Sequence, residues 1–226
     1  MKKFHSAILA AVLVFGLIFF NACGFAGFNN FNSGIQGSGT AKGETRNVSG
    51  FSKIEAAGAI HMEISNGKDF SVSLEADDNI VGNIKTEMNG DTLKIYAQDR
   101  ITPKTKISVK ISMPELKGLE VSGASRAIIA NEKTDALELE ASGASKIKID
   151  GEAKTFKSNA SGASGIDAEN LRVENAEVEA SGASSTTVSA SGELKANASG
   201  ASNIYYTGEP KNVVKDASGA SSVKKK

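Results

Sequence analysis

A four-residue motif, Ser-Gly-Ala-Ser, occurs six times in the second half of the sequence at a nearly constant spacing. The intervals between successive copies are 20, 19, 20, 18 and 19 residues. The copies begin at Ser122, Ser142, Ser161, Ser181, Ser199 and Ser218. A period near 20 residues is typical of a solenoid, in which each repeat forms one coil and packs against its neighbours. We therefore predict that residues 119–226 form a repeat-built β-solenoid.

Apolar and polar residues alternate on both sides of the motif, as Leu137, Leu139 and Ala141 do before it and Ile147 and Ile149 do after it. A period of two indicates β-strands whose apolar side chains point inward. Helical repeats are poor alternatives, because the runs are short, rich in Gly and Ser, and lack a helical period. The predicted fold class is all-β, a parallel β-helix or solenoid of about 19-residue coils. Each coil is expected to contain a strand, the motif as a corner, a second strand and a variable turn.

Charged residues recur at fixed places before the motif. The fourth residue before it alternates in sign in the order Glu138, Lys157, Glu177 and Lys195. The second residue before it is, in successive coils, Glu140, Asn159, Glu179, Asn197 and Asp216. Equal positions lie above one another in a parallel stack, and like charges stacked directly are destabilising. We interpret these patterns as ladders that stabilise the fold.

The Ser-Gly-Ala-Ser corner has two interpretations. In the structural one, Gly supplies the backbone freedom of a tight corner, Ala fills a narrow interior, and stacked serines form hydrogen bonds along the solenoid. In the functional one, a flat array of hydroxyl groups binds a glycan or ice. We favour the structural interpretation, because corners have a sufficient local reason to contain Gly and Ser.

Residues 44–118 differ from the repeat, although they also contain alternating runs. Asn66-Gly67 and Asn89-Gly90 separate consecutive runs, and Asn-Gly is the strongest short signal for a β-hairpin. We predict an antiparallel or mixed β segment that caps the solenoid. Ala57-Gly58-Ala59 resembles a degenerate corner, so the first coils are also expected within this segment.

The first residues have the features of an export signal. Lys2 and Lys3 precede an uncharged apolar run, Ser6 to Phe20, which is shorter than the ~20 residues of a membrane-spanning helix. The following Asn-Ala-Cys resembles a relaxed lipobox of Bacteroidetes-type lipoproteins. We predict a signal peptide at residues 1–22, lipid attachment at Cys23 and a flexible tether at residues 23–43. An incidental cysteine beside a cleaved signal is the alternative.

Few residues in the sequence are typical of catalytic or metal sites. Cys23 is the single cysteine, and the two histidines are His5, within the signal peptide, and His61, which we expect to face solvent. We predict no catalytic residues, no metal site and no cofactor. Asp77-Asp78 is interpreted as a turn before Asn79, with weak calcium binding as the alternative. The balance of 26 basic and 26 acidic residues argues against a nucleic-acid partner.

Several segments resemble the head GIN domain family, whose members are described as heads of auto-transporter adhesins. The resemblance covers about residues 46–222. It is carried by Phe51, the run to Ile64, Asp77-Asp78-Asn79, Asn89-Gly90, Met113-Pro114-Glu115-Leu116 and the Ser-Gly-Ala-Ser repeats. It implies an exported β-helical domain and provides no catalytic residues to transfer to this chain.

We expect a non-catalytic cell-envelope lipoprotein that acts as a binding, adhesion or scaffold module. Its partners would be the membrane, through lipid on Cys23, and a glycan, an envelope protein or a second copy of the chain. The alternatives are a β-helical carbohydrate-active enzyme and a self-assembling structural solenoid. The residues after Cys23 contain neither an Asp that would favour inner-membrane retention nor an acidic cluster that would favour surface export. Attachment to the outer membrane facing the periplasm is therefore expected, with the cell surface as the alternative.

Overall fold

The computed structural model describes residues 34–226, so the predicted signal peptide and Cys23 lie outside the described residues. About 67% of the described residues are in strands, and the only helical element among them is the short 3-10 helix η1 (Val81–Asn83). The strands before the repeat are β1 (Ile35–Gln36), β2 (Ala41–Arg46), β3 (Lys53–Gly58), β4 (Ile60–Asn66), β5 (Ser71–Asp77), β6 (Ile84–Asn89), β7 (Thr92–Ala97), β8 (Ile101–Thr102) and β9 (Ile107–Met113). Those of the repeat are β10 (Gly118–Gly123), β11 (Arg126–Ala141), β12 (Lys146–Ala160), β13 (Gly165–Ala180), β14 (Ser185–Ala190), β15 (Glu193–Ala198), β16 (Asn203–Thr207), β17 (Asn212–Ala217) and β18 (Ser222–Lys225).

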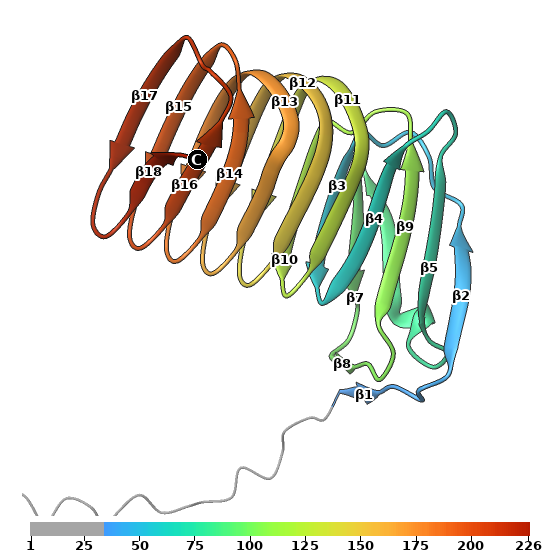
Figure 1. The fold of residues 1–226 in the computed structure, drawn as a ribbon. Helices are drawn as coiled ribbons and strands as arrows, with labels where there is room; N and C mark the ends of the chain where they lie inside the picture. The colour runs from blue at the N-terminus through green and yellow to red at the C-terminus, as the bar shows by residue number, and fades with distance from the viewer. Residues whose placement is uncertain (1–33) are drawn as a thin grey trace, which may run out of the picture. The chain divides into compact units, whose positions relative to one another are not determined.

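The repeat forms a parallel β-solenoid of about five turns, which confirms the predicted fold class. Strands β10, β11, β12 and β13 pair in parallel, and β13 then pairs with both β14 and β15. Strands β16 and β18 continue from β14, while β17 continues from β15. Figure 1 shows these coils as a flattened stack, with the Ser-Gly-Ala-Ser corners along one edge and a rounded bend along the other. The six corners therefore delimit the successive turns of the stack.

The variable segment is more regular than predicted in three coils, whereas the predicted turns containing Gly192 and Gly208 form in the later ones. In β11, β12 and β13 it continues as strand around the bend instead of forming a turn. The backbones of neighbouring coils stay paired there, as Glu132 with Gly151 and Gly151 with Leu171. Register shifts just before these pairs absorb the differences in coil length. A bulge changes the direction of a strand with little loss of pairing, which explains why the bend remains extended.

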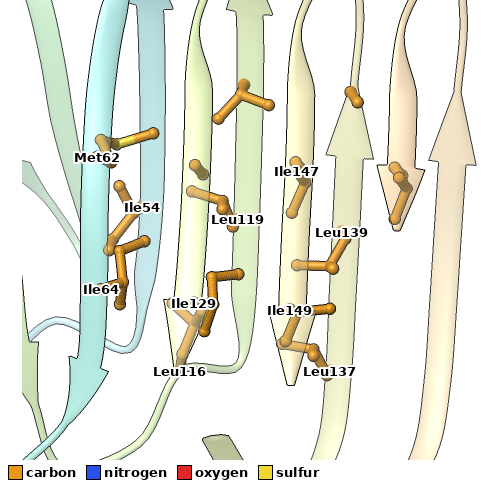
Figure 2. Close-up of a cluster of buried hydrophobic side chains, with 14 of the residues drawn as sticks. Ile54, Met62, Ile64, Leu116, Leu119, Ile129, Leu137, Leu139, Ile147 and Ile149 are labelled. Carbon is orange, nitrogen blue, oxygen red and sulfur yellow. The ribbon is translucent and has the colours of Figure 1, made fainter. Parts of the chain in front are cut away.

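The core lies between the two faces of the flattened coil. Figure 2 shows Leu137 and Leu139 of one face and Ile147 and Ile149 of the other pointing into the same interior. All four side chains are at most 3% exposed. Complete burial of such a side chain contributes roughly 1.5–3 kcal/mol, so the alternating apolar residues supply most of the stabilisation. The predicted inward direction of these residues is confirmed.

Identical backbone contacts between neighbouring coils hold the corner. The corner glycines adopt positive φ, for example 69° at Gly143 and 71° at Gly162. The amide of Ala163 donates to the carbonyl of Gly143 at 2.7 Å, and Oγ of Ser164 donates to the carbonyl of Ala141 at 2.9 Å. The second serine of the motif is therefore the inward residue, and it is buried in the first five copies.

The predicted role of the motif's alanine was wrong. The alanines are exposed at the outside of the corner instead of filling the interior: Ala124, Ala144, Ala163, Ala183, Ala201 and Ala220. The chain reverses direction within the motif, and the left-handed glycine turns the following residue outward. The second serine then enters the narrow interior, where its hydroxyl group donates a hydrogen bond to a carbonyl oxygen of the neighbouring coil.

The segment before the repeat contains a further coil and a cap. Strands β3 and β4 pair in parallel with β10 and β11, and Gly58 aligns with Gly123 of the first corner. The degenerate corner at residues 57–59 is therefore confirmed. Outside this coil, β7 pairs with β3 and β9 pairs with β4, also in parallel. Strands β6, β5 and β2 complete the cap with antiparallel pairs.

Only one of the two predicted hairpins forms. Asn89-Gly90 joins β6 and β7, which pair antiparallel. The hairpin at Asn66-Gly67 was wrong, because β9 lies between β4 and β5 and pairs with both. The amide of Gly67 donates to the carbonyl of Met113 on β9 at 2.8 Å. The partner of β4 is β9, which lies more than 40 residues further along the sequence. A local turn signal such as Asn-Gly therefore does not reveal this pairing.

The described residues also correct the predicted extent of the tether. Strand β1 pairs with β8, and β2 pairs with β5 from Ala41 onward. Residues 34–43 are therefore part of the β structure. Their Gly and Ser content predicted a flexible segment, but two existing strand edges supply the hydrogen bonds that order it.

Gly162→Ala is expected to destabilise the solenoid more than Gly50→Ala. Both glycines have positive φ, 71° and 81°, so both substitutions introduce backbone strain of about 1 kcal/mol. A Cβ at residue 162 would also lie 2.8 Å from the carbonyl oxygen of Gly143, whereas a Cβ at residue 50 meets nothing within 4 Å. Separating the two coils should cost a further ~1–3 kcal/mol. Urea unfolding measures both losses, and equal losses would contradict the stacking role of the corner glycines.

Candidate functional site

The outer surface of the solenoid has three sides. We call the side before the corner the pre-corner face, the side after it the post-corner face, and the third side the bend. The sequence indicated no ligand-binding residue, and its single predicted site, Cys23, lies outside the described residues. Within residues 34–226 no helix has the length and hydrophobicity to cross a bilayer, and no three His, Asp or Glu side chains gather as a metal site.

The second serine of the motif does not contribute a hydroxyl group to an open array at the corner. It is buried in the first five copies, and from the second copy onward its Oγ donates to a carbonyl of the neighbouring coil, as in Ser184 to Ala160 at 3.0 Å and Ser202 to Ala180 at 2.9 Å. The first serine of each motif stays half-buried or exposed beside Gly and Ala. The inward serine agrees with the structural interpretation of the motif.

The pre-corner face carries the predicted ladder of alternating charge. Glu138 aligns with Lys157, Lys157 with Glu177, and Glu177 with Lys195. Nζ of Lys157 lies 3.2 Å from Oε1 of Glu138. Each cation on this row has a carboxylate one coil away. The exposed ion pairs contribute less than ~1 kcal/mol each, and they neutralise the face locally.

The second row on this face contains a like-charge stack that sequence reasoning missed. Glu120 lies between Glu55 and Glu140 in register, and only Glu55 has a cation beside it, Lys94 at 2.7 Å. Burial raises the pKa of Glu120, and the charges of Glu140 and Glu55 raise it further. The row continues through Asn159, so it avoids further like-charge neighbours beyond Glu140, as predicted. Glu120 and Glu55 each lie two residues before a corner, at Ser122 and at Ala57, so the spacing of the corners in the sequence already contained this stack.

The bend carries two more ladders of alternating sign. Lys154 pairs with Asp135 at 2.7 Å, and Arg172 forms an ion pair with Glu152. The ion pair with Lys154 holds the pKa of Asp135 below its ordinary value. Charges on the bend are therefore also neutralised between coils.

The post-corner face differs, because its central cations have no carboxylate within ion-pair distance among the described residues. They are Arg126 on β11 and Lys146 and Lys148 on β12, and all three are exposed. Arg126 is directly aligned with Lys146. Beside them lies exposed Ile128, 47% accessible, at the rim of a shallow recess of about 570 Å³. This face therefore combines unpaired positive charge, an exposed apolar side chain and a hollow.

His61 lies on the same face and aligns with Arg126. Its side chain is partly exposed, in line with the expectation that it faces solvent. Burial lowers its pKa, and the positive charges of Lys106 and Arg126 lower it further. Lys106 and Arg126 thus add positive charge on either side of His61 at this part of the surface.

Two buried carboxylates have structural surroundings. Asp77 is fully buried, and its oxygens accept hydrogen bonds from the amides of Gly39 at 2.7 Å, Lys104 at 2.8 Å and Thr105 at 3.1 Å. Burial raises its pKa, but these amides outweigh that effect and hold the pKa below the ordinary value. Oxygen atoms that accept three amide protons are not free to bind calcium, so Asp77 joins two loops of the cap.

Glu132, only 1% exposed, accepts a hydrogen bond from the amide of Leu116 at 3.2 Å, while its other oxygen, Oε2, has no partner. Burial raises the pKa of Glu132. The neighbouring carboxylate of Glu115 accepts a hydrogen bond from the hydroxyl of Thr134 at 2.8 Å. A covered carboxylate of this kind does not reach a ligand at the surface. It connects the cap with the first coil.

A family model described as "Putative auto-transporter adhesin, head GIN domain" matches residues 50–210, which is more than two thirds of the chain. The chain belongs to the head GIN domain family. The resemblance drawn from the motifs is thereby confirmed, and the matched residues contain most of the cap and most of the solenoid.

Solved structures share the fold of this head GIN domain. A "putative adhesin" from Bacteroides fragilis NCTC 9343 superposes with a TM-score of 0.69 at 21% identity, covering 85% of this chain and 100% of its own. A "putative lipid binding protein" from Parabacteroides distasonis ATCC 8503 has a TM-score of 0.53 at 21% identity, covering 85% and 99%. A "putative adhesin" from Parabacteroides merdae ATCC 43184 has a TM-score of 0.53 at 17% identity, covering 85% and 98%. No curated protein matches the chain in sequence.

Glu120→Gln is expected to raise the melting temperature at pH 7.5 and to leave it unchanged near pH 3. The folded-state pKa of Glu120 is raised, so its charged form destabilises the fold as pH rises through that pKa. Below the unfolded pKa of about 4.3 the wild-type carboxyl is neutral in both states, and the substitution has no charge to remove.

Glu179→Gln is the matched control for this effect. Glu179 occupies the same row, but its neighbours are Asn159 and Asn197. Its removal should not raise the melting temperature at pH 7.5. The melting temperatures of wild type and of both variants are measured by circular dichroism at the two pH values. An equal change of melting temperature in both variants would contradict the repulsion within the Glu55, Glu120 and Glu140 stack.

Proposed function

We propose that this head GIN domain protein is an exported, lipid-anchored module of the cell envelope that binds other envelope or surface molecules without catalysing a reaction. The observation that carries the proposal is the regular outer surface of the coils. Outward side chains form straight rows with one residue per coil, as Glu138, Lys157, Glu177 and Lys195 do. A surface that repeats at ~4.8 Å suits an extended partner that lies across several coils.

The family description supports a role in adhesion or binding. The names of the three structural relatives, two adhesins and one lipid-binding protein, also describe binding proteins. The carboxylates that come closest to a catalytic pair, Glu115 and Glu132, are a poor basis for glycoside chemistry, because Glu132 is covered and both accept hydrogen bonds from the fold. Catalysis on a polysaccharide requires two carboxyl groups that flank the bond to be cleaved.

We further propose that the protein is anchored through Cys23 to the outer membrane. The apolar run before Cys23 and the relaxed lipobox support this assignment. A lipid chain contributes about 0.8 kcal/mol per buried methylene group, and two or more chains give stable attachment. The residues after Cys23 favour an orientation towards the periplasm.

Cys23→Ser is expected to abolish lipid attachment and to release the protein from the membrane fraction. Cells are grown with an alkyne-bearing fatty acid, and the labelled protein is detected after coupling to a dye. Wild type should carry the label and sediment with membranes. Ser49→Ala serves as the matched control and should behave as wild type. Labelling of the Cys23→Ser protein would contradict anchoring through this residue.

Protease treatment of intact cells is expected to leave residues 44–226 undigested until the cells are lysed. This outcome corresponds to a domain that faces the periplasm and binds envelope components. Digestion in intact cells would instead place the domain on the surface and make adhesion its leading role. A periplasmic enzyme and a cytoplasmic protein provide the lysis controls.

The non-catalytic part of the proposal has its own test. Purified protein is incubated with envelope polysaccharides, and new reducing ends are counted. Turnover by the wild type that disappears in Glu115→Gln would contradict the proposal and favour a carbohydrate-active enzyme.

A further inference from the structure

One row of outward residues on the post-corner face lies directly beside the corner, and we call it the corner row. Its positions are aligned one coil apart on β4, β11, β12, β13, β14 and β16. Its residues are His61, Arg126, Lys146, Gly165, Ser185 and Asn203. The first three residues of the row are therefore basic. The other three are uncharged: Gly165 has no side chain, Ser185 has a hydroxyl group and Asn203 has an amide.

The basic part of the corner row is, beside the Glu55, Glu120 and Glu140 stack, an exception to the pairing of opposite charges between coils. On the pre-corner face and on the bend, cations align with carboxylates, as Lys157 does with Glu138. On the corner row Arg126 aligns with Lys146, and neither forms an ion pair within 4.0 Å in the described part of the chain. Like charges stacked directly are destabilising. Where a regular fold accepts such a cost, function is the usual reason.

The recess lies over the same part of the row. It has a volume of about 570 Å³, and Gly165 leaves its floor open because glycine has no side chain. Arg126, Lys146 and Ile128 form one end of the recess, and Ser185 and Thr187 form the other. Three cations, an apolar side chain, hydroxyl groups and one carboxylate, that of Asp167, thus surround a hollow that crosses the strands along the solenoid axis. A mixed lining of this kind suits a sugar chain that carries acidic groups.

The next outward row limits the width of a ligand. It contains Glu63 beside Ile128, then Lys148, then Asp167. Glu63 is paired with Lys110 at 3.7 Å, and Asp167 accepts a hydrogen bond from the amide of Glu169 at 3.3 Å. A broad anionic surface would meet both carboxylates. A narrow anionic chain that follows the corner row meets Arg126 and Lys146 and stays clear of Glu63. Asp167 lines the recess, but it lies beside Lys148, the cation with which it is aligned.

We propose that the corner row binds a single strand of an acidic polysaccharide, with Arg126 and Lys146 contacting its carboxylate or sulfate groups and Ser185 and Asn203 its hydroxyl groups. This inference rests on the proposed binding function and names its ligand class. Guanidinium and ammonium groups form charge-assisted hydrogen bonds with such anions, and these are the strongest polar contacts available on an exposed face. The positive charge on either side of His61 agrees with a positive potential along the row.

Two other occupants fit less well. The acidic row of a second copy, Glu55, Glu120 and Glu140, lies on a sheet face, and its Glu55 is already paired with Lys94 at 2.7 Å. An anionic bilayer is flat and wide, so it would face Glu63 and Asp167 as well as the cations. Both occupants remain distinguishable in the experiment.

The test measures binding of polygalacturonate, a carboxylated polysaccharide, to the full chain by isothermal titration calorimetry, with neutral dextran as the comparison. Wild type should bind polygalacturonate and not dextran, and the affinity should fall as salt rises. Arg126→Gln combined with Lys146→Gln should weaken binding at least about tenfold, because two charge-assisted contacts are lost. The same variant should melt at the same temperature as wild type or slightly higher, since a like-charge pair is removed.

Lys53→Gln combined with Lys117→Gln is the matched control, because it removes two cations outside the corner row. It should bind as wild type does. Equal binding by both double variants, or no binding by wild type, would overturn the inference and leave the proposed function standing. Two other outcomes would also overturn the inference. If no protein binds polysaccharide and the corner-row double variant alone loses binding to phosphatidylglycerol vesicles, the ligand is a membrane. If wild type forms a concentration-dependent dimer in sedimentation velocity and the corner-row double variant does not, the ligand is a second copy of the chain. Cleavage of polygalacturonate by wild type would overturn the proposed function itself.

Discussion

Hydrogen bonds between the backbones of successive corners fix the register of the whole solenoid. The amide of each corner alanine reaches the carbonyl of the preceding coil's glycine, at 2.7 Å for Ala163, Ala183, Ala201 and Ala220. This contact requires the two coils to approach so closely that a Cβ on Gly162 would lie 2.8 Å from the carbonyl oxygen of Gly143. Glycine is needed there for its positive φ and for its lack of a side chain. Once the corners are stacked, every strand that leaves them is aligned.

That alignment turns single residues into rows. A residue at a given distance from the corner lies directly above its counterpart, so a sequence period becomes a line of side chains across the strands. Inward lines build the core from Ile, Leu, Val and Ala, and the scarcity of aromatic residues, 6% of the chain, suits this narrow interior. Outward lines determine the surface electrostatics. Two sides of the solenoid pair opposite charges between coils, while the corner row keeps Arg126 and Lys146 unpaired.

The cap covers the open strand edge at the N-terminal end of the solenoid. A stack of parallel strands ends in unpaired backbone groups, which are templates for pairing with other chains. Strands β7 and β9 add one more parallel layer, and β6, β5 and β2 then cover it with antiparallel pairs. Asp77 joins the loops around this cap through three backbone amides. At the other edge, Lys215 occupies an inward register position and its Nζ donates to the hydroxyl of Tyr206 at 3.0 Å. An inward charge of this kind opposes further stacking.

The sequence by itself determined the solenoid, its corners, its inward residues and its main charge ladder, because these depend on period and alternation. The same motifs were also sufficient to indicate the family. Only the tertiary structure decided the topology of residues 44–118, where β9 separates β4 from β5, since long-range pairing overrides a local Asn-Gly signal. The tertiary structure also decided that the second serine of the motif, and not the alanine, points inward. The preceding glycine has positive φ, which turns the alanine outward. Five residues of the corner row directly follow a Ser-Gly-Ala-Ser motif, so the period of the sequence already aligns them. The tertiary structure added His61, which lies 65 positions before Arg126 and meets it only when their coils stack.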